Sequence, residues 1–242
     1  MAPQPFADRL AARVAERESQ IVLGLDPDPA RLWPDAVAQA PADGPPARRA
    51  AAAVRAHCAA LIDAAGPACV AAKPQLACFE RLGADGWAAL AATVDRAREA
   101  GLLVIADGKR GDISVSAAAY AQALVGSTPT PFGDVAGLGA DAFTANPLMG
   151  ADTLATLVDG ARAAGAGVFV LVRTSNPGAA DVEDLELAQD GACGMSSRIR
   201  GTCSGTVAPT TAPTSDRPLA GATAPAPGRP AYPLCAGWPR SI

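Results

Sequence analysis

Five short runs of apolar residues divide the first three quarters of the chain, and each is followed by polar or turn residues. The runs cover residues 21–25, 69–72, 102–106, 142–145 and 168–172. Continuous apolar runs of this length are typical of parallel strands that are buried on both faces. The pattern therefore predicts a parallel sheet in this part of the chain.

Alanine-rich stretches with helical spacing of their apolar positions lie between these runs. They cover about residues 47–65, 86–100, 114–125 and 151–164, and a glycine stands near the C-terminal end of several. Strands that alternate with helices favour a parallel α/β fold, either a barrel or a doubly wound sheet. A complete barrel needs eight such units, and five are used by about residue 175.

The sequence changes in character near residue 191. Residues 191–242 hold eight proline and five arginine residues, a single acidic residue, and no run typical of a strand. Such a segment has too few large apolar side chains to offset the entropy of ordering it. We therefore expect residues 1–190 to form the barrel portion, and residues 191–242 to be a disordered tail or the product of a frame change.

Composition excludes several classes of protein. The net charge of −4 argues against a broad basic surface for nucleic acid, and no apolar run reaches the length of a membrane span. The single histidine, His57, and six cysteines without a CxxC pair predict no metal site. The N-terminus lacks the features of a secretory signal, so we expect a cytoplasmic protein with reduced thiols.

Lysine is scarce in this chain, and its positions are informative. Of the 20 basic side chains only Lys73 and Lys109 are lysines. Unlike arginine, lysine is a compact ammonium that can give up its proton, which chemistry at a site requires and a solvated surface does not. Both lysines follow predicted strands, so they are candidates for chemistry.

Polar residues stand at the carboxyl end of every predicted strand. In chain order they are Asp26, Lys73, Asp107 with Lys109, Asn146, and Ser175. Functional sites of parallel barrels and open α/β sheets lie at these ends, so we expect the side chains to converge on one mouth. In an extended chain, the spacing of two also places Asp107 and Lys109 on one face. Asp112 lies beyond the strand and must be placed by the loop.

Five motifs in the chain resemble the orotidine 5′-phosphate decarboxylase family, in particular its longer bacterial branch, over about residues 5–188. The motifs are Val22-Leu-Gly-Leu-Asp-Pro27, Lys73-Pro-Gln75 with Phe79-Glu80, Ala106-Asp-Gly-Lys-Arg-Gly-Asp-Ile113, Leu138-Gly-Ala-Asp-Ala-Phe-Thr-Ala-Asn-Pro147 and Arg173-Thr-Ser-Asn-Pro-Gly178. The resemblance implies a (β/α)8 barrel of the ribulose-phosphate-binding type, acting as a homodimer without metal or organic cofactor. It also implies conversion of orotidine 5′-monophosphate to UMP and CO2 in pyrimidine biosynthesis.

The same resemblance implies a role for each matching residue at the reacting centre. Asp107 would lie against the departing carboxylate, and Lys109 would protonate C6 of the pyrimidine. Lys73 would bind the ribose and hold Asp107 in place. A fixed ammonium beside a developing carbanion provides preorganised stabilisation, which agrees with this assignment.

Residues around that centre are implied to bind the rest of the substrate. Asp26 would bind a ribose hydroxyl, and Asp112 would reach the ribose in the neighbouring subunit's site, with Ile113 and Ser116 nearby. Ser175 would contact the edge of the pyrimidine. Together these residues would form a nucleotide site shared between two subunits.

The sequence departs from the family after residue 188. Family members continue through strands that supply a glycine-rich loop and an arginine for the 5′-phosphate, and neither is found here, so no phosphate-binding residue is assigned. Two alternatives to an active orotidine-phosphate decarboxylase stay open. One is a truncated, inactive barrel that lacks the phosphate-binding segment. The other is a related phosphate-sugar decarboxylase with the same Asp-x-Lys strand end.

Overall fold

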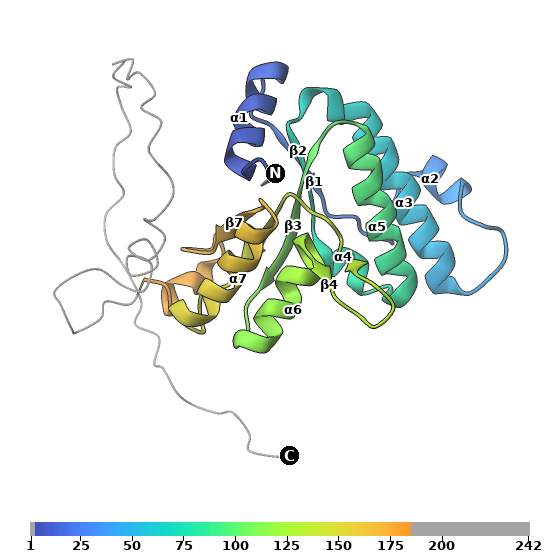
Figure 1. Cartoon of the computed structure of the whole chain (residues 1–242). Coiled ribbons are helices and arrows are strands. Elements are labelled where there is room, and N and C mark those ends of the chain that lie inside the picture. The colour runs from blue at the N-terminus through green and yellow to red at the C-terminus, as the bar shows by residue number, and fades with distance from the viewer. Residues whose placement is uncertain (1–2, 185–242) are drawn as a thin grey trace, which may run out of the picture. The chain divides into compact units, whose positions relative to one another are not determined.

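The computed structural model describes residues 3–184, so the expected tail at 191–242 lies outside the described residues (Figure 1). The helices are α1 (Phe6–Arg17), α2 (Pro34–Ala38), α3 (Pro46–Ala65), α4 (Leu76–Glu80), α5 (Gly83–Glu99), α6 (Ser114–Val125) and α7 (Ala151–Ala163), with 3-10 turns at Gly66–Ala68 and Pro177–Asp181. The strands are β1 (Val22–Leu25), β2 (Ala71–Pro74), β3 (Leu103–Arg110), β4 (Ser127–Thr128), β5 (Val135–Ala136), β6 (Ala142–Ala145) and β7 (Gly167–Val170). All five predicted strands and all four predicted helices are present.

The main sheet has the order β1-β2-β3-β6-β7, and every neighbouring pair is parallel. Its strands therefore follow one another in chain order, each connection carrying at least one helix. A doubly wound sheet reverses its strand order at a switch point, and the described strands contain no such reversal. The described part thus has the topology of five successive units of a (β/α)8 barrel, and the separate β4–β5 hairpin is an insertion between β3 and β6.

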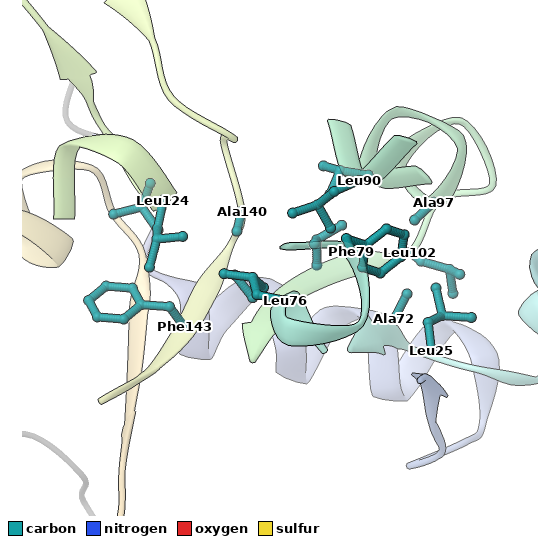
Figure 2. Packing of buried hydrophobic residues seen from close by; sticks show 14 of the residues in the cluster. Leu25, Ala72, Leu76, Phe79, Leu90, Ala97, Leu102, Leu124, Ala140 and Phe143 are labelled. Carbon is teal, nitrogen blue, oxygen red and sulfur yellow. The ribbon is translucent and has the colours of Figure 1, made fainter. Parts of the chain in front are cut away.

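Helices cover the sheet and bury its apolar runs. Neighbouring helices pack in pairs, α3 beside α5 and α6 beside α7 (Figure 1). The largest side chains between helices and sheet are fully buried, among them Phe79 and Leu90 on one side and Phe143 on β6 (Figure 2). Burial of a side chain of this size contributes about 1.5–3 kcal/mol, so these contacts hold the strands in position.

Helix α1 closes the amino ends of the strands. Phe6 packs with the first residues of β2, β3 and β6 in a separate apolar cluster. The Arg17 guanidinium donates hydrogen bonds to the carbonyls of Cys69, at 2.7 Å, and Ala100, at 2.8 Å, which precede β2 and β3. The amino end of the described sheet is therefore covered, and the polar residues lie at its opposite end.

Candidate active site

One buried carboxylate lies between the two lysines of the chain. Asp107 is only 5% exposed. The Nζ of Lys73, on β2, donates to Asp107 Oδ2 at 2.6 Å, and the Nζ of Lys109 donates to Oδ1 at 2.7 Å. The structure therefore brings together three of the predicted residues at the carboxyl ends of adjacent strands.

Two further side chains complete the surroundings of this carboxylate. Thr144 on β6 donates from Oγ1 to Asp107 Oδ1 at 2.9 Å, and Gln75 donates from Nε2 to Oδ2 at 3.4 Å. Sequence reasoning gave neither residue a role. Gln75 belongs to a quoted motif, and Thr144 is the one polar residue in the apolar run 142–145. The sequence therefore contained a signal for each of these residues.

The charge of Asp107 is stabilised by its partners rather than by solvent. Burial alone would raise the pKa of this carboxyl, because a buried charge loses hydration. Hydrogen bonds from Lys109, Lys73 and Thr144 outweigh burial and lower the pKa of Asp107 below its ordinary 3.8. The group is therefore a carboxylate at neutral pH, and each lysine has a fixed anion to hold its ammonium.

A bulge, and not regular strand alternation, makes Asp107 and Lys109 neighbours. Ala106 on β3 pairs with Phe143 on β6, but Arg110 pairs with Ala145, so β3 has two extra residues at this point. Lys109 has a φ of 48°, in the left-handed region. The ion pair shows that the two side chains are neighbours, but the reason given for this from the sequence, an extended chain with period two, was wrong.

The chain that follows the bulge is anchored on both sides. Arg110 forms an ion pair with Glu80 and lies over the ring of Tyr120, 5.5 Å from its centroid. The backbone N–H of Asn146 donates to the Arg110 carbonyl at 2.8 Å. A Cβ at Gly111 would lie 2.4 Å from the Asn146 carbonyl oxygen, so glycine is required for this close approach.

The remaining predicted residues lie at the same end of the sheet but outside this hydrogen-bonded cluster. Asp26 directly follows β1, and Gly24, two residues before it, is the register partner of Lys73. The Asp112 carboxylate accepts the backbone N–H of Ile113 at 2.7 Å. Ile113 is 61% exposed, and Ser116 lies in the first turn of α6. Within residues 3–184, none of these four side chains is hydrogen-bonded to Asp107.

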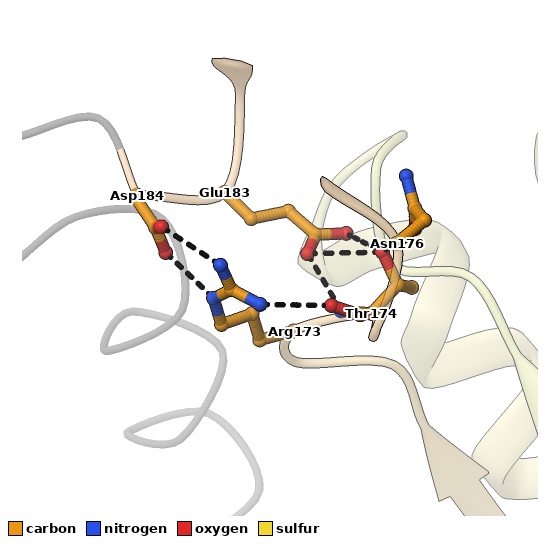
Figure 3. Close-up of polar contacts among 5 residues, drawn as sticks. All are labelled: Arg173, Thr174, Asn176, Glu183 and Asp184. Carbon is orange, nitrogen blue, oxygen red and sulfur yellow. Dashed lines mark hydrogen bonds and ion pairs between the residues drawn. The ribbon is translucent and has the colours of Figure 1, made fainter. Parts of the chain in front are cut away.

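Ser175 lies in the loop that follows β7. Polar contacts among Arg173, Thr174, Asn176, Glu183 and Asp184 hold this loop (Figure 3). Arg173 donates to both carboxylate oxygens of Asp184, at 2.9 and 3.0 Å. The carboxylate of Glu183 accepts the backbone N–H of Thr174 at 2.7 Å. Thr174 also donates from Oγ1 to Asn176 Oδ1 at 2.7 Å. These contacts hold the residues on either side of Ser175, which is itself exposed.

Among residues 3–184 there is no group of three or more histidine, cysteine or carboxylate side chains arranged to hold a metal ion. No helix in the same part of the chain is long and apolar enough to cross a membrane.

Comparison with known proteins gives concordant results. The model of the Orotidine 5′-phosphate decarboxylase / HUMPS family matches residues 19–222. Orotidine 5′-phosphate decarboxylase of Rhodopirellula baltica is 39% identical over 185 residues, 75% of this chain and 59% of the relative. That of Haloarcula marismortui is 42% identical over 183 residues, 76% of this chain and 57% of the relative. The chain thus spans less than two thirds of these curated relatives.

A solved structure resembles this chain, and the family match extends further along the chain than the sequence motifs. The OMP decarboxylase structure of Leishmania donovani is 33% identical, with a TM-score of 0.62, covering 84% of this chain and 66% of that one. The family match reaches residue 222, beyond residue 188, where the resemblance was expected to end. The expectation that the C-terminal part does not match the family was therefore wrong over part of its length.

Proposed function

The chain belongs to the orotidine 5′-phosphate decarboxylase / HUMPS family, and from this membership we propose that it decarboxylates orotidine 5′-monophosphate to UMP and CO2. The names of the curated relatives support this substrate over a sugar phosphate. We also propose a cytoplasmic location, in keeping with the free thiols of Cys58, Cys69 and Cys78.

The observation that carries the proposal is the carboxylate of Asp107 held between two ammonium groups. When the bond between C6 and the carboxyl carbon breaks, CO2 leaves and the electron pair remains on C6. The Lys109 ammonium stabilises this negative charge and transfers a proton to C6, which forms the new C–H bond of UMP. Lys109 then regains a proton from water, since its side chain is 43% exposed.

The other residues of the proposal bind and orient the substrate. Lys73 holds Asp107 at 2.6 Å and donates to the ribose, while Asp26 accepts a ribose hydroxyl. Ser175 contacts the pyrimidine edge, for which its accessibility in a fixed loop provides support. Asp112, with Ile113 and Ser116 nearby, reaches the site of a second subunit, so that the working unit is a homodimer.

Turnover by the full 242-residue chain tests the proposal directly. The loss of orotidine 5′-monophosphate absorbance and the appearance of UMP should be followed with the chain and with Lys109→Ala as the inactive control. A 3-keto sugar-acid phosphate serves as the alternative substrate. Preference for the sugar phosphate would show that the chain is a phosphate-sugar decarboxylase and not a nucleotide decarboxylase.

A hybrid protein separates the site from the completeness of the barrel. Residues 1–188 would be joined to the corresponding C-terminal part of the Haloarcula marismortui relative. Turnover by the hybrid alone would show that the site is competent and that the chain lacks the segment for the phosphate. If neither protein decarboxylates the nucleotide while both are folded, the proposed function is wrong.

A further inference from the structure

The hydroxyl of Thr144 makes two hydrogen bonds to the residues proposed to do the chemistry. It accepts the backbone N–H of Lys109 at 2.8 Å and donates to Asp107 Oδ1 at 2.9 Å. One side chain on β6 thus contacts both the backbone of one residue and the carboxylate of the other. No other side chain of the described residues bonds to both Lys109 and Asp107 in this way.

The bulge in β3 creates the need for this hydroxyl. Between the pairs Ala106–Phe143 and Arg110–Ala145, three residues of β3 lie opposite the single residue Thr144. Extra residues in a bulge lose their regular ladder partners, and an unpaired N–H near a buried charge is unfavourable. The Thr144 hydroxyl accepts the Lys109 N–H where the β6 backbone does not.

The backbone of Lys109 also needs support because its conformation is uncommon. Its φ of 48° lies in the left-handed region, which residues with a side chain rarely adopt. Such a conformation persists only where surrounding contacts hold it, and it is concentrated at functional sites. The hydrogen bond to Thr144 is a contact of this kind, because it fixes the peptide from which the Lys109 side chain starts.

We infer that Thr144 is a positioning residue that holds the Lys109 ammonium in its reactive place through the Lys109 backbone and the Asp107 carboxylate. The expected effect of Thr144 on turnover rests on the proposed function. The inference that Thr144 holds Lys109 in place rests on the two hydrogen bonds alone. Thr144 acts through Lys109 and Asp107 and contacts no reacting atom itself.

Three substitutions separate the hydroxyl from the shape of the side chain. Thr144→Val keeps the volume and removes both hydrogen bonds, Thr144→Ser keeps the hydroxyl, and Thr144→Ala is a second hydroxyl-free variant should valine impair folding. In the full chain we expect the hydroxyl-free variants to lower kcat about tenfold to a hundredfold, with KM changed less than about threefold. Thr144→Ser should stay within about threefold of the parent in both constants.

The pH dependence of kcat is a measurement that the loss of a merely structural residue would not change. The charged groups facing Asp107 are Lys73 from β2 and Lys109 from β3, and β6 contributes the uncharged Thr144. Loss of the Thr144 donor removes one cause of the lowered pKa of Asp107. The acid limb of kcat should therefore move to higher pH in Thr144→Val and stay in place in Thr144→Ser.

Hydrogen exchange tests the inference without any turnover. The Lys109 amide should exchange at least about tenfold faster in Thr144→Val than in the parent, and at the parental rate in Thr144→Ser. The matched control is Thr93→Val, the same change at a buried threonine of α5 whose hydroxyl donates to the Ala89 carbonyl at 2.7 Å. It should leave Lys109 exchange and kcat unchanged.

The outcomes separate this inference from the proposed function. Equal exchange at Lys109 in the valine, alanine and serine variants would overturn the positioning role, as would equal kcat values in a turning-over parent. If the folded parent and the hybrid protein both lack turnover, the proposed function is wrong, and the exchange rates would still decide whether Thr144 holds Lys109.

Discussion

At the scale of single residues, the cluster around Asp107 shows how a buried charge is tolerated. A carboxylate removed from water is costly unless it is paired and hydrogen-bonded. Asp107 has an ammonium on each oxygen, Lys73 at 2.6 Å and Lys109 at 2.7 Å, and a threonine hydroxyl besides. The lysines are about a third and two fifths exposed, so they remain accessible to a substrate while Asp107 is covered.

Replacement of Lys109 should abolish turnover in any version of the protein that decarboxylates. We expect Lys109→Ala to lower kcat by about a thousandfold, since it removes both the proton and the positive charge beside C6. Lys109→Arg should not restore activity, because a guanidinium has another shape and does not release its proton. The control Arg48→Ala removes an exposed cation of α3. Turnover above about a hundredth of the parent in Lys109→Ala would remove this residue from the mechanism.

Asp107 should make stability depend on pH in the acid range. Its pKa in the folded protein lies below the ordinary 3.8, so its ionised form stabilises the fold above that pH. This contribution is lost as the pH falls through the folded-state pKa. At pH 7 we expect Asp107→Asn to lower the free energy of unfolding by roughly 1–3 kcal/mol, a range that allows for the partly exposed lysines.

Urea unfolding at a series of pH values measures this effect. The difference between the parent and Asp107→Asn should be constant from pH 7 down to about pH 5 and should shrink below pH 3.8, the ordinary pKa of the carboxyl. Asp43→Asn, at an exposed position before α3, is the control. A difference between parent and Asp107→Asn that stays constant down to pH 2 would show that Asp107 is not stabilised as an anion.

At the scale of elements, helices and strands were predictable where they repeat a regular pattern. Helix α6 spans 114–125 in both the pattern and the structure, and α3 begins within one residue of its predicted start. The short α2 and α4 were not predicted, because five residues are too few to show a helical period. Helix α1 was also missed. Its apolar signal was present, because Phe6, Leu10 and Val14 recur at helical spacing and pack in one apolar cluster.

The junction of α4 and α5 depends on one glycine. A Cβ at Gly86 would lie 1.9 Å from the carbonyl oxygen of Phe79, so the two helices approach too closely for any side chain there. We expect Gly86→Ala to lower the free energy of unfolding by roughly 2–3 kcal/mol through this overlap. Chemical denaturation checks it against Gly178→Ala, where the nearest atom would be 3.4 Å away. Equal stabilities of the two variants would refute the close packing.

At the scale of the whole molecule, the parallel direction of the strands brings the cluster around Asp107 to one end of the sheet. Helix α1 covers the amino ends of the strands, and Lys73, Asp107, Lys109 and Thr144 lie at the carboxyl ends. Within the described part, β1 and β7 each have a neighbour on one side only. The site is therefore assembled by the middle of the described sheet, where β2, β3 and β6 adjoin.

A mixing experiment tests the proposed sharing of sites between two subunits. Lys109→Ala and Asp112→Ala should each be inactive, but a heterodimer of the two contains one site with both residues intact. After refolding together, random pairing should restore about a quarter of the parental activity. Native mass spectrometry must show that heterodimers are present. An inactive mixture that contains them would mean that Asp112 acts within its own chain.

The sequence by itself determined the alternating strands and helices and the polar residues at the strand ends, because both signals are local. It also contained the motifs around Lys73 and Asp107 that identify the family. The alternation of strands and helices left a barrel and a doubly wound sheet open. The strand order of the tertiary structure, which depends on how helices pack, agrees with the barrel that the motifs implied. Only the tertiary structure decided the bulge at Lys109, although Gly108 inside a strand was a signal for it. The contact of Asp107 with Thr144 joins residues far apart in the chain, and such a pairing exists only once β3 and β6 lie side by side.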